Sequence, residues 1–476
     1  MSRHLLVFIL LVFTYNVSCI TIDLESAQAV RNVSSKFVGV TLDAGLIAKR
    51  WKTFNFTSQK VLTLAKGMSP SYLRIGGTAG DRMIFNMTHD QRNSPNHRHY
   101  AMKVADWDNL NHLVMNAGLD LIFNFNVLLR KNGNWDPTNA KELLEYTVKQ
   151  GYKPAGYELG NEPNYFRGAV SEKQLAKDFA ALKNIVSSSG VPPFLTIGPD
   201  VGGMLPGSKA PTFLKNFLEA GGGDVVDVVT VHQYYSTGRN VTLKDFTDRK
   251  VLDTFIPEVD LFVKTCNEKA PNKQCWLGET SSFSHGGAPH ISDRYVAGFL
   301  WLDKLGLSAL RGLQGVLRQQ FYGGNYALLD TNLNPNPDYW LTLIYKRLVG
   351  SPVFDVTQTT DHNVRVYAHC TNVSSSIGYK PGSITVYIMN IGSVTVSVDI
   401  PFSSSKTQQR YILSPGDDNG LTSQFVKLNG NVLMLPNDNS LPPLIPVFSN
   451  DTLQLKAYNM GFVVIPDAMK AECMQT

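Results

Sequence analysis

The stretch GYELGNEPNYF (residues 156–166) decides the fold. It begins as an apolar run with the length of a buried strand, and it then places Asn161, Glu162 and Pro163 where that strand should end. A carboxylate and an amide are costly in a strand core, but they are typical of the carboxyl end of a barrel strand, where polar side chains line a site. We therefore ask whether other apolar runs in the chain end in the same way.

Short apolar runs alternate with longer amphipathic segments from Phe37 to Leu348. Two of the longer segments, 139–150 and 171–190, have helical spacing of apolar residues, begin with Asn or Ser, and have Gly at or after their ends. Strand and helix alternating eight times predict an α/β fold, a (β/α)8 barrel over residues 37–348. The candidate strands are FVGVTLDA (37–44), SYLRIGG (71–77), LDLIFNFNV (119–127), GYELGNEP (156–163), FLTIGPDVG (194–202), VVDVVTVHQYY (225–235), CWLGETSS (275–282) and GVLRQQFY (315–322).

The pattern changes after Gly350. Runs such as HNVRVYAHCT (362–371) and GSITVYIMNIG (382–392) alternate apolar and polar residues and are broken by Gly, Pro and Asn. Residues 349–476 are therefore predicted to form a β-sandwich. The strand-like segment at 20–36 precedes the barrel, and we expect it to pair with the C-terminal sheet.

Residues 1–19 predict entry into the secretory path. They contain a basic start, the apolar run LLVFILLVF and then small residues, which is the order of a cleaved signal. The apolar run is too short to span a bilayer, and no later segment is long and apolar enough. We expect a secreted protein, extracellular and associated with the matrix or the lysosome, with no transmembrane segment. It should be glycosylated at the sequons of Asn32, Asn55, Asn86, Asn240, Asn372 and Asn450.

Four cysteines remain after Cys19, and they allow three pairings. We favour Cys266 with Cys275, which are close in sequence, and Cys370 with Cys473, which would tie the last residues to the C-terminal module. Free buried thiols are the alternative, and they are less common outside the cytosol.

Composition excludes several classes of protein. With 43% hydrophobic and 17% charged residues and no repeat, the chain is an ordinary globular protein. The net charge of +5 suits an acidic partner without identifying one. Because basic and aromatic clusters are missing, nucleic acid is not an expected partner.

Glu162 and Glu279 are the candidate catalytic pair. Glu162 ends the fourth predicted strand, and Glu279 in CWLGETSS ends the seventh. Although they are 117 positions apart in the chain (279 − 162), the two side chains can therefore face each other across one barrel mouth. Hydrolysis of a glycosidic bond needs one protonated and one ionised carboxyl group, and a separation of about 5 Å favours a covalent intermediate and retention. The sequence therefore predicts a glycoside hydrolase.

Neighbouring residues are predicted to support this pair. Asn161 can bond the 2-hydroxyl of a sugar, and Pro163 turns the chain out of the strand. His232 and Tyr234, at the end of the sixth strand, are predicted to hydrogen-bond Glu279. Arg74, in LRIGGT, is predicted to hold Glu279 ionised.

Three histidines raise the alternative of a metal site. His89, His97 and His99 lie in HDQRNSPNHRHY (89–100), a polar segment that lacks cysteine or carboxylate partners at ligand spacing. Because glycoside hydrolysis by two carboxylates needs no metal, we expect neither a metal nor another cofactor.

These motifs resemble the heparanase family, the retaining endo-β-glucuronidases of glycoside hydrolase family 79. The resemblance runs over nearly the whole chain after the signal, including SYLRIGGT, YELGNEPN, GPDVG, HQYY, WLGETSS, GGAP, AGFLWLDKLGLSA, LRQQFYGGNY, PDYWLTLIYKRLVG and RVYAHCTN. It implies Glu162 as the acid/base, Glu279 as the nucleophile, and a barrel joined to a sandwich built from both ends of the chain. It also implies that Gly286 presents its backbone to a uronic carboxylate. The remaining residues implied to line the cleft are Asp43, Thr78, Asn161, Asn164, Tyr234, Arg239, Gln319, Gly324 and Tyr326.

The chain departs from the vertebrate members of this family. Those proteins carry a long segment between the second and third strands that is excised on activation, whereas here 119 − 78 = 41 positions separate Thr78 from Leu119. Their basic cluster is reduced to Arg92, Arg98 and nearby histidines, and their paired arginines after GPDVG to Lys209. We expect a single active chain without linker excision, and weaker or differently placed recognition of sulfated sugar.

The substrate therefore stays open at this point. Leech hyaluronidases share the short connection and HQYY, whereas the GGAP loop, Arg239 and GGNY look more like heparanase. We favour heparan sulfate, with hyaluronan cleaved at glucuronic acid as the alternative glycosaminoglycan. An exo-acting β-glucuronidase and a glycosaminoglycan-binding protein without activity are the further alternatives.

Overall fold

The computed structural model describes residues 19–87, 99–166, 168–356, 361–402, 407–437 and 439–475. The predicted signal up to residue 18 lies outside these ranges, as do His89, His97, Arg92 and Arg98. In the described ranges no helix has the length and apolar character needed to cross a membrane.

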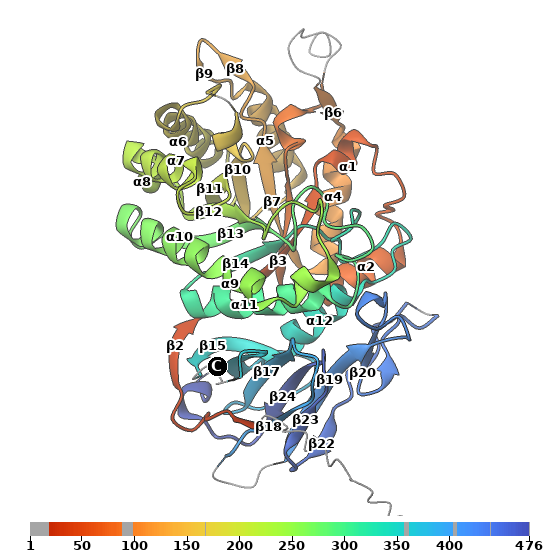
Figure 1. Ribbon diagram of the computed structural model, residues 1–476. Coiled ribbons are helices and arrows are strands. Elements are labelled where there is room, and N and C mark those ends of the chain that lie inside the picture. Colours follow the sequence, from red (N-terminus) through yellow and green to blue (C-terminus); the bar gives the residue numbers. More distant parts are fainter. Residues whose placement is uncertain are drawn as a thin grey trace, which may run out of the picture.

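Eight parallel strands close into a barrel, as predicted, in the order β10-β11-β12-β13-β14-β3-β4-β7. In sequence order, each strand before β14 is followed by a helical segment that leads to the next strand of the barrel, and β14 is followed by α12. This is the (β/α)8 architecture (Figure 1). The strands are β3 (Val38–Asp43), β4 (Ser71–Gly76), β7 (Leu119–Phe125), β10 (Gly156–Leu159), β11 (Leu195–Gly202), β12 (Val228–Gln233), β13 (Gln274–Thr280) and β14 (Gly315–Arg318).

Helices surround the barrel, and their ends follow local sequence signals. Ser171 caps α6 by accepting a hydrogen bond from the Gln174 N–H, and Gly151 ends α5 with a φ of 71°, which glycine adopts without strain. The main helices are α2 (Gln59–Gly67), α4 (Val104–Ala117), α5 (Thr138–Gln150), α6 (Glu172–Ser188), α7 (Lys209–Phe217), α10 (Phe255–Lys269), α11 (Ala297–Arg311) and α12 (Pro337–Leu348), with shorter α1 (Gly45–Ala48), α8 (Gly223–Val225) and α9 (Arg249–Asp253).

The barrel interior is apolar at one end and polar at the other. Five strands contribute one residue each to a small inner cluster of Ile122, Ile197, Val228, Trp276 and Leu317. Further along the strands, the inward side chains are charged or polar, beginning with Arg74 and Glu158. This change from apolar to polar along the strands marks the carboxyl end as the functional end.

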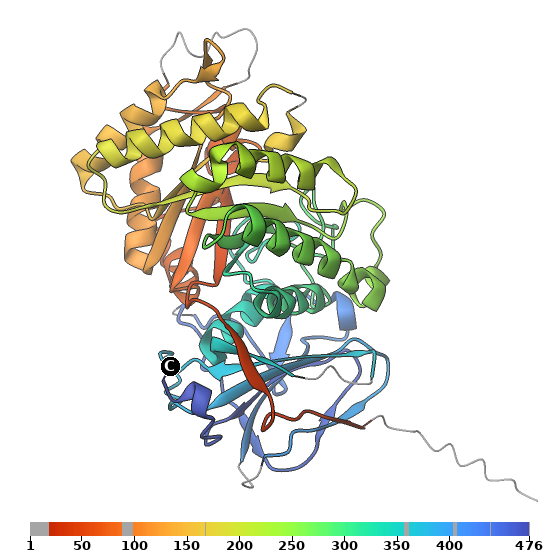
Figure 2. The ribbon, with the colours of Figure 1, turned by 90° about the vertical axis from the view of Figure 1, so that its left-hand side faces the viewer.

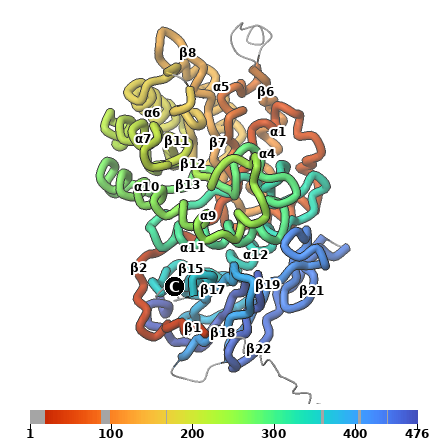
Figure 3. Tube along the Cα trace, in the orientation of Figure 1, coloured from red at the N-terminus to blue at the C-terminus, as the bar shows by residue number. Residues whose placement is uncertain are grey.

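The C-terminal region is a sandwich of two sheets, which includes both N-terminal strands. The larger sheet has the order β2-β15-β16-β17-β24-β19-β20-β21, with β22 on β19, and the smaller has the order β1-β18-β23. Figure 2 shows β2 along the side of the sandwich, and Figure 3 shows β1 beside β18. The strands are β1 (Cys19–Thr21), β2 (Gln28–Asn32), β15 (Val349–Asp355), β16 (Val364–Thr371), β17 (Ile384–Asn390), β18 (Val396–Asp399), β19 (Gln408–Pro415), β20 (Val426–Leu428), β21 (Asn431–Val432), β22 (Val447–Ser449), β23 (Leu453–Leu455) and β24 (Met460–Ile465). The expected pairing of the two ends of the chain is therefore confirmed.

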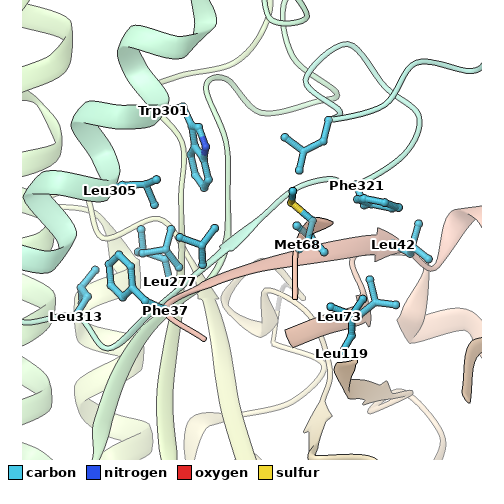
Figure 4. Packing of buried hydrophobic residues seen from close by; sticks show 14 of the residues in the cluster. Phe37, Leu42, Met68, Leu73, Leu119, Leu277, Trp301, Leu305, Leu313 and Phe321 are labelled. Atoms are coloured by element: carbon cyan, nitrogen blue, oxygen red, sulfur yellow. The ribbon is translucent and has the colours of Figure 1, made fainter. Parts of the chain in front are cut away.

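The barrel and the sandwich meet through α11 and α12, which lie between them (Figure 1). On the barrel side, Trp301 and Leu305 of α11 face Leu277 and Phe37 of the barrel wall (Figure 4). On the other side, the Tyr367 hydroxyl of β16 donates a hydrogen bond of 2.6 Å to Asp303 Oδ1 of α11. One helix thus packs against both parts of the chain.

Both predicted disulfides are present. Cys266 of α10 bonds Cys275 of β13, and Cys370 of β16 bonds Cys473 in η6 (Ala471–Cys473). The second bond ties the end of the chain to the centre of the larger sheet. Of the sequon asparagines, Asn372 is half-buried and its Nδ2 donates to Lys346 O at 2.7 Å, whereas the other five are exposed.

Candidate active site

The structure brings Glu162 and Glu279 together at the carboxyl end of the barrel. One carboxylate oxygen of each, and one ring nitrogen of His232, all lie within 4.8 Å of one another. The Glu162 side chain is 25% exposed and that of Glu279 is 10% exposed. Two carboxylates from distant strands are therefore adjacent and within reach of solvent.

The loop after β10 holds Glu162 in a defined position. Glu162 has a φ of 50°, in the left-handed region, and its N–H donates to Asp200 O at 2.9 Å. Pro163 begins the short helix η2 (Pro163–Tyr165), which turns the chain out of the strand as predicted. A Cβ on Gly202 would stand 2.9 Å from Glu162 Cδ, so only glycine lets β11 come this close. An unusual backbone conformation that its surroundings enforce is typical of a functional residue.

Two donors hold Glu279, and both were predicted. Arg74 Nη1 donates to Glu279 Oε2 at 2.9 Å, and the Tyr234 hydroxyl donates to Glu279 Oε1 at 2.7 Å. Burial and the charge of Glu279 raise the pKa of Tyr234 well above its ordinary value, so the phenol keeps the proton it donates. Each carboxylate oxygen therefore has one donor.

The predicted hydrogen bond between His232 and Glu279 is wrong. His232 Nδ1 lies 3.0 Å from Glu162 Oε1, and Nε2 lies 3.4 Å from Asp200 Oδ1. Because Arg74 and Tyr234 already serve both oxygens of Glu279, the imidazole bridges the other carboxylate and the end of β11 instead. Burial disfavours the charged ring, but Glu279 and Asp200 outweigh it and raise the pKa of His232 to about 10, so the ring is an imidazolium at neutral pH.

Beneath the pair lies a buried charge network that the sequence analysis missed. Arg74 is fully buried, and its guanidinium contacts Glu158 at 2.8 Å and Asp200 at 2.9 Å as well as Glu279. Burial and the neighbouring Asp200 raise the pKa of Glu158. For Asp200 burial acts in the same direction, but Arg74 and His232 outweigh it and hold its pKa below the ordinary range. The signal was available, because Glu158 and Asp200 are carboxylates within otherwise apolar strand sequences.

Asp81 is a second missed residue, and it lies under the same loop. It belongs to η1 (Gly80–Arg82), and its Oδ2 accepts a hydrogen bond of 3.1 Å from the Asn161 N–H. Burial raises the pKa of Asp81 to about 8. Nothing in the local sequence distinguishes it from an ordinary turn aspartate.

Several residues that the family resemblance implied are grouped around Glu279. Asp43 Oδ2 accepts a hydrogen bond of 2.9 Å from Gln319 Nε2, and burial and Glu279 both raise the pKa of Asp43. The rings of Tyr326 and Tyr234 stack with centroids 6.2 Å apart. These side chains form one wall beside the carboxylate.

Two of the implied polar residues are engaged with their own chain. Asn161 Oδ1 accepts from Arg74 Nη2 at 3.2 Å. Asn164 is bonded in both directions to Gly202, because its Nδ2 donates to Gly202 O at 3.0 Å and its Oδ1 accepts from Gly202 N at 2.9 Å. Asn164 therefore anchors β11 to the Glu162 loop.

The glycine loops lie beside each other, whereas two implied residues make no hydrogen bond to the carboxylate pair. Gly286 O accepts from the Asn325 N–H at 2.8 Å, and a Cβ on Gly324 would stand 3.8 Å from the same oxygen. Thr78 and Arg239 are exposed, and neither hydrogen-bonds a carboxylate of the pair within the described chain. Arg239 lines a pocket of about 370 Å³ beyond Tyr235.

Glu162, His232 and Glu279 also have the spacing of a three-ligand metal site. Their surroundings argue against a cation there, because Arg74 already places a positive charge 2.9 Å from Glu279. A doubly protonated His232 has no lone pair to offer a metal. Both carboxylates already accept hydrogen bonds or contacts from cationic or phenolic groups of the protein.

A closed parallel barrel that brings two carboxylates to within 4.8 Å at its carboxyl rim defines a glycoside hydrolase. Comparison with known proteins agrees with this class. The model of glycosyl hydrolase family 79, N-terminal domain, matches residues 20–306, and the chain belongs to glycoside hydrolase family 79.

Individual relatives cover nearly the whole chain. Heparanase of Mus musculus is 38% identical over 95% of this chain and 94% of its own length. Hyaluronoglucuronidase of Hirudo nipponia is 34% identical over 95% of this chain and 99% of its own. A solved 4-O-α-L-rhamnosyl-β-D-glucuronidase from Fusarium oxysporum superposes with a TM-score of 0.70 over 93% of this chain and 99% of its own at 17% identity, which is a likeness of fold.

Proposed function

We propose that the protein is a secreted, retaining endo-β-glucuronidase that cleaves heparan sulfate by double displacement, with Glu162 as the acid/base and Glu279 as the nucleophile. The observation that carries the proposal is the distance of at most 4.8 Å between oxygens of the two carboxylates. Retaining enzymes have their carboxyl groups about 5 Å apart, whereas inverting enzymes need room for a water molecule between the carboxylate and the sugar.

The two carboxylates have different hydrogen-bond partners, and each is assigned one role. Glu279 accepts hydrogen bonds from Arg74 and Tyr234, so both of its oxygens are fixed in position. In the first step a Glu279 oxygen attacks the anomeric carbon while Glu162 gives its proton to the leaving oxygen. In the second step Glu162 removes a proton from water, and the water displaces Glu279 from the sugar. His232 contacts Glu162 rather than Glu279, and it orients the acid/base carboxyl group.

Recognition of the uronic acid is proposed for the glycine loops. Gly286 has a φ of 89° and Gly324 has a φ of 83°, and open space surrounds the position of a Cβ on Gly286. Backbone N–H groups in such a loop can approach an anion closely because no side chain intervenes. Asp43, Gln319 and Tyr326 would line the same end of the site, and Thr78, Asn164 and Arg239 more distant parts of the cleft.

Heparan sulfate is favoured over hyaluronan by the GGAP loop, Arg239 and GGNY, and by the identity to heparanase. Hyaluronan, the alternative substrate, has its own support, because this chain aligns with 99% of the length of the leech hyaluronoglucuronidase. The two substrates differ in sulfation, so they differ in the positive charge that they require.

Secretion is proposed from the signal-like N-terminus, and the two disulfides suit an oxidising compartment. Glycosylation at Asn32, Asn55, Asn86, Asn240 and Asn450 is compatible with their exposure. Activity without excision of a linker follows from the short connection between Thr78 and Leu119.

The test is digestion of heparan sulfate and of hyaluronan by the purified full chain at mildly acidic pH, with the products sized by chromatography. We expect internal cleavage of heparan sulfate, with products of intermediate length. Release of monosaccharide only would mean that the enzyme is exo-acting rather than endo-acting. Cleavage of hyaluronan alone would mean that hyaluronan, not heparan sulfate, is the substrate.

Three variants separate catalysis from binding. Glu279→Gln should lower kcat by at least about a thousandfold, because the nucleophile is lost. Glu162→Gln should keep a fast first step on an aryl glycoside whose leaving group needs no protonation, seen as a burst of aglycone, while the second step stays slow until added azide replaces water as the nucleophile. Glu172→Gln, a half-buried carboxylate in the first turn of α6 on the outside of the barrel, is the matched control and should retain activity. Wild-type chain that binds both polymers but turns over neither would identify a binding protein.

A further inference from the structure

Lys304 of α11 is a buried lysine directly behind the active site. Its residue is 1% exposed. Its Nζ donates to Thr280 Oγ1 at 2.8 Å and to Ser281 O at 2.6 Å, and it lies 4.4 Å from the ring centroid of Tyr235. The amino group therefore touches the two residues that follow Glu279 in the chain.

A lysine in this place is costly to the fold. Among the described residues it forms no ion pair, and the charges of Glu258 and Asp303 offset only part of the loss of water around a charged amine. Burial lowers the pKa of Lys304 well below its ordinary value, and Arg318 adds to the effect. In either protonation state the amino group has the two N–H donors that its two acceptors need. An apolar side chain would fill the position at less cost, so the two hydrogen bonds are what distinguish the lysine from such a residue.

These hydrogen bonds belong to a series of connected hydrogen bonds that links two barrel strands. Thr280 Oγ1, which accepts from Lys304, itself donates to Gln233 O of β12 at 2.5 Å. Thr280 O accepts from the Gln319 N–H at 2.8 Å, and Ser282 O accepts from the Tyr235 N–H at 3.0 Å. The turn after Glu279 is thus fixed to both neighbouring strands, and Lys304 is its only contact of this kind from the surrounding helices among the described residues. A hydroxyl that accepts and donates at once strengthens both bonds.

We propose that Lys304 is a positioning residue for the nucleophile: its buried amino group fixes Thr280 and Ser281 from behind and thereby aims the Glu279 carboxylate at the anomeric carbon. The inference rests on the proposed function, in which Glu279 is the nucleophile. Nucleophilic attack is sensitive to such aim, because a displacement of about 1 Å can cost about a hundredfold in rate.

Lys346 of α12 provides a matched control at the opposite end of the barrel. It is also a buried lysine, 7% exposed, and its Nζ donates to two backbone oxygens, Pro70 O at 2.6 Å and Ser35 O at 3.4 Å. Those residues precede β4 and β3, so Lys346 ties strand starts where Lys304 ties a strand end. A purely structural role predicts the same consequences for the loss of either amine.

The experiment compares Lys304→Met with Lys346→Met in the full chain, on glycosaminoglycan and on an aryl glycoside with an activated leaving group. For Lys304→Met we expect kcat to fall about 10- to 100-fold with KM within about twofold, because ground-state binding is unaffected while the attack is misaligned. The activated leaving group should not restore this loss, whereas it should restore the first step in Glu162→Gln, because attack by Glu279 is needed for either substrate. Lys346→Met should retain wild-type kcat whatever its melting temperature.

Thr280→Val is the milder variant should Lys304→Met fail to fold, since it keeps the shape and removes the hydroxyl that accepts from Lys304 and donates to Gln233 O. It should lower kcat in the same pattern as Lys304→Met. A folded Lys304→Met or Thr280→Val with the kcat of Lys346→Met would overturn the inference and leave the proposed function standing. Wild-type chain without turnover on any glycosaminoglycan would instead overturn the proposed function, and the inference with it.

Discussion

Arg74 is the residue on which the charge balance of the site depends. It is the shared partner of Glu158, Asp200 and Glu279, and it is fully buried. Removing one partner of a buried ion pair leaves an uncompensated charge, which costs about 3 to 5 kcal/mol. We expect Arg74→Met to lower the free energy of unfolding by at least this amount, measured by urea unfolding.

The matched comparison is Lys183→Met, which breaks the partly exposed pair between Lys183 and Asp227. An exposed pair contributes only about 0 to 1 kcal/mol, so this variant should stay close to wild type. Equal losses in the two variants would mean that the buried network is not a structural requirement.

Tyr234 makes the hydrogen bond that most directly tests the environment of Glu279. Tyr234→Phe removes the donor to Glu279 Oε1 and keeps the ring that stacks on Tyr326. A hydrogen bond to a charged group is worth about 1.5 to 3 kcal/mol, so kcat should fall about 10- to 100-fold. Tyr146→Phe also removes a phenol donor to a carboxylate, that of Asp108 on the outer helices, and it should leave kcat unchanged.

At this scale the sequence identifies strand-end residues well and their partners less well. Glu162, Glu279, Arg74 and Tyr234 could be found because strand ends in a barrel face one mouth. The partner of His232 could not, because the choice between Glu162 and Glu279 depends on which oxygens Arg74 and Tyr234 already occupy. That choice is made by three strands together, and no local pattern encodes it.

At the scale of elements, the loop after β10 depends on η1 beneath it. The Asp81 carboxyl of η1 accepts the Asn161 N–H, and its pKa is raised by burial to about 8 from an ordinary value of 3.8. The fold therefore favours the neutral acid. Below pH 3.8 the acid is neutral in both states and costs nothing. As the pH rises from 3.8 to 8, ionisation favours the unfolded chain and the protein loses stability.

Asp81→Asn should remove this loss, since the amide stays neutral and its oxygen can still accept the Asn161 N–H. The stability of the variant relative to wild type should rise with pH between 4 and 8, by roughly 5 kcal/mol at most from the size of the pKa shift. Urea unfolding of both proteins at pH 4, 6 and 8 measures the difference. A difference that is the same at all three values would show that Asp81 is ionised in the folded protein throughout.

Elements were easier to predict than contacts, and the reasons are local. The eight barrel strands were recognisable as apolar runs, and Gly151 and Ser171 marked the ends of helices. The start of α5 was less clear, because the sequence suggested Asn139, whereas the helix begins at Thr138 after Pro137. The strands near the two ends of the chain were predictable, but their order in the sheet was not. The order β2-β15-β16 depends on contacts between strands that lie more than 300 residues apart in the chain.

At the scale of the whole molecule, the barrel and one face of the larger sheet share a hydrophobic core, while a second cluster lies within the sandwich. A single continuous cluster of buried residues contains Leu277 of the barrel, Trp301 of α11, and Tyr387 and Phe462 of the sandwich. A Cβ on Gly306 of α11 would meet the Tyr367 ring of β16 at 2.3 Å, so the two parts are in direct contact. The change in sequence pattern near Gly350 therefore separates two architectures that share a core.

This continuity predicts that the protein unfolds as one unit. Calorimetry of the full chain should give a single transition whose calorimetric and van't Hoff enthalpies agree. A fragment of residues 20–348 should aggregate, because α11 and α12 would expose the apolar faces that pack on the sandwich. Two resolved transitions, or a soluble fragment with native ellipticity, would mean that the barrel is independently stable. In that case the sandwich would not be needed to hold α11 against β13, and the support that Lys304 gives to Glu279 would have to come from the barrel alone.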